Sequence, residues 1–386
     1  MNRILYLSPG PTPYPKDPNR NIFFHLSKYF EGDVLSPIWG KKSNDSIALI
    51  KKIDLAMDKF NYHVTFSFNI PPLIKTLWDI SFYLLKGLKI YKSNKYNIIV
   101  TYGFLKTGIA GILLKILTGA KLIIEVPGNP KKIYIFDKQN PSLLDILKNR
   151  TINMLIPYII RKADHLKLLY PNQLENYNIK IKRNCISIFH DFVPISTIKP
   201  SNLKDENFIL FVGFPWYLKG VDILIKAFLL ISDEFPKYRL KIIGFCPNKK
   251  YFEDLAKGNN KIELHGAVSN EHVIKLMKKC TLFILPSRTE AMGRVLLEAM
   301  ACKKPIIASK VDGIPFYIKH GFNGLLFESE NIYDLANKMR IILRDSNYAR
   351  KLAQNGYVLV NKQLSEKSYV ANYKKMIDKV LNNNRY

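Results

Sequence analysis

Two glutamates flank a predicted helix start in the second half of the chain. Thr281–Pro286 predicts a buried strand, and Gly293–Lys303 predicts a helix that ends before a proline. Glu290 lies in the loop between them, and Glu298 lies about 7.5 Å along the helix from its start. The amides of the first turn belong to Gly293, Arg294 and Val295. Free amides at a helix start bind anions, and carboxylates accept hydrogen bonds from hydroxyl groups. The segment therefore suits a diphosphate with sugars on both sides, although each glutamate alone also fits an ordinary exposed acid.

A second strand–loop–helix segment carries a glycine and a lysine. Phe208–Gly213 predicts the strand, and Gly220–Ser232 predicts the helix. Gly213 lets a ligand approach the backbone, because it has no side chain. Lys219 lies at the mouth of the helix, where its ammonium group would neutralise a diphosphate. Among 59 Lys and Arg residues, Lys219 also fits an ordinary surface lysine.

These segments belong to an alternation of strands and helices along the whole chain. The other strands are predicted over Arg3–Ser8, Tyr62–Ser67, Tyr96–Thr101, Lys121–Val126, Cys185–Phe189, Arg239–Gly244, Lys261–His265 and Pro305–Ser309. The other helices are predicted over Arg20–Phe30, Ile70–Lys92, Leu105–Leu117, Ser142–Ala163, Ser269–Lys279, Asn331–Leu343 and Ser365–Leu381. Such alternation predicts an α/β protein whose parallel sheets are covered by helices on both faces.

The alternation occurs twice, and a polar stretch with two prolines, Phe192–Asn207, separates the halves. We therefore predict two doubly wound, Rossmann-like domains, over residues 1–200 and 201–363, which face each other across a deep cleft. Ligands of such sheets bind at the carboxyl ends of the strands. Catalytic and ligand-binding residues are consequently expected in the loops after the strands.

Composition narrows the class of protein. The 386 residues are 47% hydrophobic, which excludes a mostly disordered chain, and 59 basic against 31 acidic residues give a net charge of +28. Such a charge attracts polyanions, which include nucleic acids, anionic membranes and phosphorylated substrates. The four cysteines form no CxxC pair. With no signal peptide or spanning segment evident, we expect a cytoplasmic protein, peripheral at most on the inner face of the cell membrane.

Taken in order and spacing, a set of motifs points to one family. They are Val212-Gly213, Lys219–Asp222, Leu285–Ser287, Glu290, Glu298–Ala301, Pro305–Ala308, Gly313–Pro315 and Asn323–Phe327. From Phe208 to Phe327 the chain resembles the family-four glycosyltransferases, which are retaining enzymes of the GT-B fold that use nucleotide sugars. The resemblance also implies that the last helix, within residues 364–386, crosses back to the first domain. Its apolar face is predicted to be Tyr369, Tyr373, Met376 and Val380.

The resemblance implies roles for individual residues. Glu290 would contact the transferred sugar, and Lys219 would grip the diphosphate; these two are the predicted catalytic residues. Glu298 would hold the ribose hydroxyls, and Val268 would lie beside the base. The remaining predicted donor-binding residues are Gly213, Gly293, Arg294 and Val295. Gly10 is the predicted acceptor-binding residue. No metal and no other cofactor is implied, and the chain contains no Asp-x-Asp motif.

Four positions depart from the family pattern. Phe214 stands where an arginine is usual, so one diphosphate contact is missing or comes from Arg288 or Arg294. Pro127 stands where many members have a histidine, and Phe316 where a glutamate is frequent. In the first loop, Ser8–Pro13 replaces a Gly-Gly pair and keeps only Gly10. The first domain therefore resembles the family in architecture more than in motif.

The leading hypothesis is a retaining transfer from a nucleotide diphosphate sugar to a lipid-linked or polysaccharide acceptor in bacterial cell-surface glycan synthesis. One alternative is a GT-B nucleotide-sugar epimerase. Another is a non-enzymatic polyanion-binding protein, although no nucleic-acid motif or compact basic cluster supports a nucleic-acid partner.

An anionic membrane surface is a further expected partner. Along Ile70–Lys95, an apolar face of Leu73, Leu77, Ile80, Leu84 and Leu88 has lysines beside it. Such a helix either lies on an anionic membrane or packs on the sheet with its lysines in solvent.

Overall fold

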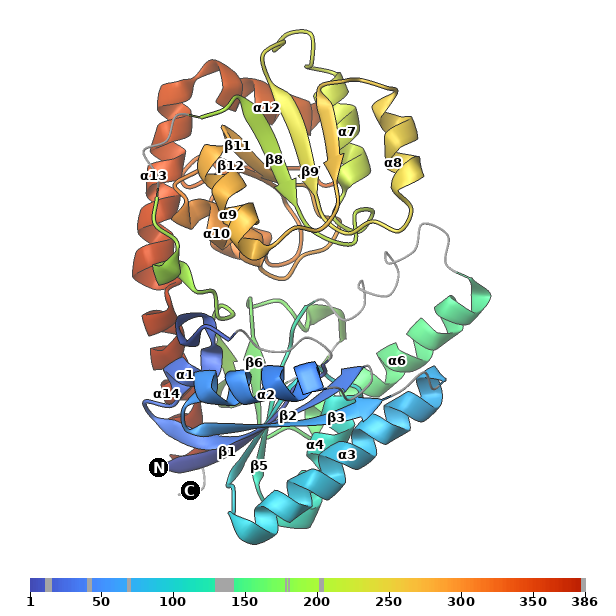
Figure 1. Ribbon diagram of the computed structural model, residues 1–386, viewed down its shortest axis with the longest axis vertical. Coiled ribbons are helices and arrows are strands. Elements are labelled where there is room, and N and C mark those ends of the chain that lie inside the picture. The colour runs from blue at the N-terminus through green and yellow to red at the C-terminus, as the bar shows by residue number, and fades with distance from the viewer. Residues whose placement is uncertain are drawn as a thin grey trace. The chain divides into compact units, whose positions relative to one another are not determined.

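The computed structural model (Figure 1) describes residues 1–10, 16–39, 44–67, 71–128, 142–177, 179, 181–200 and 205–382. The chain forms two compact units. The N-terminal unit comprises residues 1–127, 150–194 and 366–386, and the C-terminal unit comprises residues 128–149 and 195–365. The last helix thus belongs to the N-terminal unit, and the chain passes from one unit to the other after Pro127, Asn149, Pro194 and Ser365.

Seven parallel strands form the sheet of the N-terminal unit, in the order β3-β2-β1-β4-β5-β6-β7. Their bounds are β1 Asn2–Leu7, β2 Phe30–Trp39, β3 Phe60–Ser67, β4 Ile98–Tyr102, β5 Lys121–Glu125, β6 His165–Leu168 and β7 Ile186–Ile188. The sequence did not predict β2 and β6. The helix predicted over Arg20–Phe30 is shorter, because α1 covers only Ile22–Leu26 and β2 begins at Phe30.

Helices cover both faces of this sheet. On one face, α3 (Pro72–Ser93), α4 (Lys106–Thr118) and α6 (Leu143–Arg161) pack over a core that includes Leu5, Ile99 and Ile124. On the other face lie α1, α2 (Asn44–Met57) and α14 (Glu366–Asn382). The four residues predicted as the apolar face of the last helix, Tyr369, Tyr373, Met376 and Val380, all lie in this second core.

The C-terminal unit has a six-stranded parallel sheet in the order β10-β9-β8-β11-β12-β13. The strands are β8 Phe208–Val212, β9 Arg239–Ile243, β10 Ile262–His265, β11 Leu282–Leu285, β12 Ile306–Ser309 and β13 Leu325–Phe327. The helices are α7 Val221–Leu229, α8 Lys249–Ala256, α9 Asn270–Lys279, α10 Arg294–Ala301, α11 Ile314–Tyr317, α12 Ile332–Arg344 and α13 Ser346–Gln363. The stripe Val221, Leu224, Ile225 and Phe228 of α7 is fully buried, because it covers this sheet.

The stretch that the sequence predicts as a linker is partly packed. Val193 and Ile195 are fully buried, and a short helical turn, Ile195–Thr197, contacts α10 and α13. The start of this stretch around Pro194 is therefore packed, whereas Lys199 and Pro200 are exposed. Residues 201–204 of that stretch lie outside the described part of the chain.

Candidate active site

The order of the strands in the C-terminal unit marks a ligand-binding edge. Chain order runs from β8 outward to β9 and β10 on one side, and from β11 to β12 and β13 on the other. At the carboxyl ends of β8 and β11, the following loops therefore lead in opposite directions. Ligands of doubly wound sheets bind at such a switch point. These two loops contain Lys219 and Glu290.

The two predicted catalytic residues contact each other. The Lys219 Nζ atom lies 2.6 Å from Glu290 Oε2, and the two side chains are 18% and 15% exposed. Their loops are held together by Gly220, whose Cβ, if it had one, would lie 2.0 Å from the Pro286 carbonyl oxygen. Gly220 has a φ of 68°, so both its conformation and the close approach require glycine. The close contact between the two loops therefore holds Lys219 and Glu290 next to each other, and both side chains remain accessible to solvent.

Arg288, one of the two candidates for the missing diphosphate contact, is paired within the protein. Its guanidinium group donates two hydrogen bonds, of 2.8 and 2.7 Å, to the Asp222 carboxylate, and one of 2.9 Å to Glu330. It also lies over the Tyr217 ring, 4.1 Å from its centre. Burial alone would lower the pKa of Arg288, but the Asp222 carboxylate raises it. Arg288 is thus a buried connector between the two loops, and its role as the replacement for the usual arginine at position 214 stays a prediction.

The start of α10 has the features of an anion site. Gly293 has a φ of 72°, and a Cβ there would lie 2.9 Å from the side chains of Leu285 and Leu296. No side chain of the described residues caps this helix start. Arg294 is exposed, Val295 is half-buried, and Glu298 is buried in the second turn. The predicted donor-binding residues of this segment therefore surround one helix end.

Asp312, which the sequence analysis did not single out, positions the Glu290 loop. Its Oδ2 atom accepts a hydrogen bond from the Thr289 hydroxyl group and another, of 3.2 Å, from the Glu290 amide. The Gly313 amide in turn donates to the Glu290 carbonyl oxygen at 3.1 Å. Asp312 lies just before Gly313 in the third motif, so the motif itself was the signal that could have found it.

The remaining donor-side predictions lie on neighbouring loops of the same edge. A Cβ on Gly213 would lie 3.5 Å from Lys219 Cγ, so this glycine borders the lysine side chain. Phe214 is 50% exposed, and its ring lies 5.5 Å from that of Phe245, which follows β9. Val268 is 40% exposed in the loop after β10. An exposed aromatic pair thus occupies the place where the family carries a cation.

In the N-terminal unit, Gly10 follows β1. Its φ is 61°, and a Cβ there would lie 2.0 Å from the Pro37 carbonyl oxygen, so packing against β2 already demands glycine. Pro127 lies two residues after β5 and is half-buried. His190 is buried, with Nδ1 2.9 Å from the Asp191 carbonyl oxygen, and burial lowers its pKa to about 4. The His190 ring also packs against that of Tyr369, with 5.9 Å between the ring centres.

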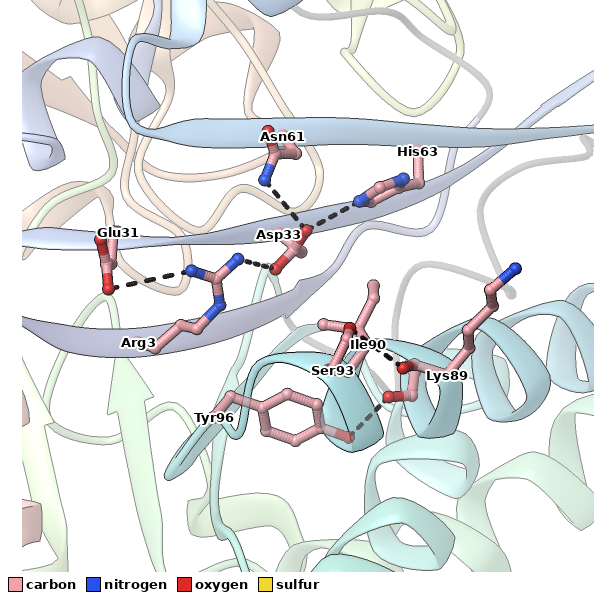
Figure 2. Close-up of polar contacts among 10 residues, drawn as sticks. Arg3, Glu31, Asp33, Asn61, His63, Lys89, Ile90, Ser93 and Tyr96 are labelled. Atoms are coloured by element: carbon pink, nitrogen blue, oxygen red, sulfur yellow. Dashed lines mark hydrogen bonds and ion pairs between the residues drawn. The ribbon is translucent and has the colours of Figure 1, made fainter.

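Figure 2 shows another polar cluster, which spans β1, β2 and β3 of the N-terminal unit. The buried Asp33 carboxylate lies 2.8 Å from both Arg3 Nη2 and His63 Nε2. Burial alone would raise the pKa of Asp33, but His63 and Arg3 lower it. Beside this cluster, a hollow of about 710 Å³ is lined by Arg3, Glu31 and Lys121, among others. Since Arg3 and Lys121 begin their strands, the hollow lies at the edge opposite the ligand-binding ends.

The described part of the chain has neither a metal-binding cluster nor a membrane-spanning helix. It contains no cluster of three His, Cys, Asp or Glu residues that could hold a metal ion. Within the same residues, no helix combines the length and the apolar character needed to cross a bilayer.

Comparison with known proteins assigns the family. Residues 195–359 match the family model described as glycosyl transferases group 1. A glycosyltransferase of Methanocaldococcus jannaschii is 33% identical over 294 residues, which cover 75% of this chain and 78% of that protein. The chain therefore belongs to the group 1 glycosyltransferases, and the family predicted from its motifs is confirmed.

Solved structures agree on the fold. Sucrose-phosphate synthase of Thermosynechococcus elongatus matches with a TM-score of 0.79 and 17% identity over 99% of both chains. The Anabaena protein HepE in complex with UDP and glucose matches with a TM-score of 0.73 and 15% identity, over 98% of this chain and 100% of that one. The two Rossmann-like sheets are thus those of a GT-B glycosyltransferase, as predicted.

Proposed function

We propose that this enzyme transfers a sugar, with retention of its anomeric configuration, from a nucleotide diphosphate sugar to an acceptor. The observation that carries the proposal is the solvent-accessible Lys219–Glu290 ion pair at the switch point, beside the uncapped start of α10. A lysine and a helix start together suit a diphosphate, because both present positive charge to it. UDP is the first nucleotide to try, since HepE was solved with UDP.

Donor binding would rearrange the ion pair. The diphosphate takes the place of the Glu290 carboxylate as the partner of Lys219, and the amides of Gly293 and Val295 donate to its oxygens. Glu290 is then free to accept hydrogen bonds from the transferred sugar. Glu298 holds the ribose hydroxyls from within α10, and Val268 borders the base. Lys219 thus pairs with one carboxylate in the free enzyme, and in the complex it shares the diphosphate charge with the amides of α10.

The proposed transfer does not need a side chain of the protein as a general base. The bond between the anomeric carbon and the diphosphate oxygen breaks, and the acceptor oxygen bonds to the same carbon on the same face. The leaving diphosphate takes the proton of the acceptor hydroxyl group. The main task of the protein is to stabilise the charge that develops on the diphosphate, which Lys219 and the α10 amides do. We propose that no divalent metal is needed for this step.

The acceptor in this proposal is a lipid-linked or polysaccharide glycan of a bacterial cell surface, reached from the cytoplasmic side. The N-terminal unit would bind it with the loop around Gly10, at the carboxyl end of β1. A nucleotide-sugar epimerase would use the same donor edge but would need no acceptor. Analysis of the products therefore separates the two reactions.

Calorimetric titration with UDP in excess EDTA tests the donor site. We expect binding, and we expect Glu298→Ala to weaken it at least ~10-fold, because hydrogen bonds to a charged group contribute roughly 1.5–3 kcal/mol each. Glu271→Ala, at an exposed position on α9, is the matched control and should bind as the wild type does. Equal UDP affinity in the Glu298 and Glu271 variants, or binding that requires added magnesium or manganese, would contradict the proposal.

A further inference from the structure

Helix α3 of the N-terminal unit is apolar on two sides. Ile80, Leu84 and Leu88 pack against the core, so these members of the face that the sequence offered to a membrane are turned inward. The side chain of Leu73 lies outside the described part of the chain. A second apolar set points outward: Ile74 (54% exposed), Leu77 (57%), Trp78 (51%) and Leu85 (72%). Their spacing of three, four and seven residues places them on one outer stripe.

The neighbouring helices extend this outer surface. Helix α4 packs along α3, and a Cβ on Gly108 of α4 would lie 2.9 Å from the Ile159 side chain of α6. The three helices therefore form one layer on the sheet (Figure 1). Large apolar side chains are also exposed on α4 and α6, at Leu113, Ile116, Leu117, Met154, Leu155 and Tyr158. We call these six and the four outer residues of α3 the outer apolar face.

The charge on α3, α4 and residues 150–161 of α6 is almost all positive, although Lys115 pairs with Asp164, which follows α6. In α3, α4 and residues 150–161 of α6 the basic residues are Lys75, Lys86, Lys89, Lys92, Lys106, Lys115, Arg150 and Arg161. The only acidic residue in those segments is Asp79, which is fully buried and paired with Lys106. A shallow hollow of about 350 Å³ lies between Trp78, Phe82 and Leu85, and Lys86 and Lys89 also line it. Apolar side chains thus alternate with cations, without an exposed carboxylate in those segments.

We propose that the outer apolar face docks on an anionic lipid bilayer. An exposed apolar surface of this extent marks an interaction site, and cations around it select a negatively charged partner. A second copy of the same face would bring like charges together, which disfavours self-association. Exposed tryptophans such as Trp78 favour the depth of the lipid headgroups.

The position of α3 gives this docking a consequence. The helix begins at Pro72, a few residues after the carboxyl end of β3, so Ile74 and Trp78 lie near the ligand-binding edge of this sheet. A bilayer beneath the outer apolar face would then present lipid-linked molecules close to that edge. The docking surface goes beyond the proposed transfer reaction and does not depend on it, because binding to lipid needs no sugar donor.

Co-sedimentation with vesicles tests the proposal. We expect the full chain to bind vesicles of phosphatidylcholine with about a third phosphatidylglycerol, and to bind pure phosphatidylcholine and high-salt samples far less. The double variant Ile116→Ser with Leu117→Ser should lower the partition coefficient at least ~10-fold, and Lys89→Glu with Lys92→Glu should lower it by a similar factor. All four positions are exposed, so the fold should survive.

Helix α2, on the opposite face of the same sheet, provides matched controls. Leu55 is 83% exposed, and Lys51 and Lys52 are exposed. Leu55→Ser, and Lys51→Glu with Lys52→Glu, make the same kinds of change and should leave vesicle binding unchanged. UDP binding should be retained in every variant, which separates failure of the docking surface from failure of the donor site.

Trp78 offers an independent readout in a Trp39→Phe background, since the sequence has three tryptophans and Trp216 is fully buried. Lipids brominated on their acyl chains should quench tryptophan fluorescence in that background, and adding Trp78→Phe should remove most of the quenching. The proposal is overturned by equal losses in the α2 and α3–α4 variants, or by absence of binding at low salt. It is also overturned by a dimer in sedimentation velocity that the α4 variant dissociates while no lipid binds.

Discussion

Two lysine–carboxylate pairs lie at the carboxyl edges of the two sheets, and both are 2.6 Å long. Lys219 pairs with Glu290 in the C-terminal unit, and Lys167 pairs with Asp191 in the N-terminal unit. The Lys219 side chain is 18% exposed, whereas the Lys167 side chain is 1% exposed. Distance alone therefore does not separate a site that receives a ligand from a structural contact. Access from solvent does.

Lys167 is enclosed by groups that only the folded unit brings together. Its ammonium group lies 3.4 Å from Glu125 Oε2 and 5.0 Å from the centre of the Phe189 ring. The Tyr373 hydroxyl group of α14 donates to the other Glu125 oxygen at 2.9 Å. Burial alone would lower the pKa of Lys167, but Asp191 and Glu125 raise it, so the group stays charged. The hydrogen bond between Tyr373 and Glu125 ties the last helix to this buried cluster, whereas Lys219 is accessible enough to exchange its partner.

Replacing each lysine by methionine should separate the two roles most strongly. Lys167→Met leaves the buried Glu125 and the half-buried Asp191 carboxylates without their cation and should reduce the free energy of unfolding by about 3–5 kcal/mol. Lys219→Met should reduce it by at most about 1 kcal/mol, yet lower turnover by about 100-fold or more. Urea unfolding and a donor-turnover assay measure both effects. Equal losses of stability in the two variants would show that Lys219 is as much a structural residue as Lys167.

Acid should weaken the N-terminal unit more than the C-terminal unit. Burial lowers the pKa of His165 and of His190 to about 4, from an ordinary value near 6.5. Between those values the unfolded chain binds more protons than the folded chain, so stability falls as pH decreases from 6.5 to 4, by up to about 3 kcal/mol per histidine. The raised pKa of Glu125, which burial causes, opposes part of this loss.

Unfolding of wild type and His165→Gln at pH 7 and pH 5 measures this effect. We expect the variant to lose less stability on acidification, while His265→Gln, at an exposed position in the C-terminal unit, behaves as the wild type does. The same pH dependence in all three proteins would show that other groups control the acid response.

Asp312→Asn should show that the position of Glu290 matters apart from donor affinity. The amide weakens the hydrogen bonds from Thr289 and from the Glu290 backbone, but asparagine tolerates the positive φ of 42° at this position. Turnover should fall about 10-fold while the dissociation constant of UDP changes less than about twofold. A fall in UDP affinity with unchanged turnover would place Asp312 in donor binding instead.

Phe214→Arg should have the smallest effect, and a favourable one. The ring is half exposed, so the substitution places a cation at the donor edge without disturbing the core. We expect UDP to bind about fivefold more tightly, because a charge-assisted hydrogen bond to the diphosphate is only partly offset by side-chain ordering. Phe214→Gln, which adds length without charge, is the control and should not improve affinity.

The sequence predicted best those elements whose burial follows from their own residues. Strands β8 and β11 are nearly continuous apolar runs, and their predicted bounds agree with the structure within one residue at each end. Strand β2 was missed because it contains Asp33, and β6 was missed because it contains His165 and Lys167. These polar groups are buried against partners on other strands, which a local pattern does not contain.

In the candidate site, too, the sequence predicted the residues that belong to local motifs and missed the contacts between distant residues. Lys219, Glu290 and Glu298 were found because each belongs to a strand–loop–helix motif. The role of Arg288 was not found, because its partners Asp222 and Glu330 lie 66 and 42 residues away. The two apolar stripes of α3 were likewise indistinguishable, because only packing decides which one faces the core.

The return of α14 to the N-terminal unit also bears on protein synthesis. Residues 1–194 are translated before the last helix, but α1 and α2 cover only part of one face of their sheet, and the cover is complete only when Tyr369, Tyr373 and Ile377 follow. In the meantime residues 195–365 are translated, and they hold nearly all of the C-terminal unit. The N-terminal unit is therefore the last to finish folding, and its nascent form exposes the part of the apolar sheet face that α14 later covers. A stop codon before residue 366 would accordingly damage the beginning of the protein rather than its end.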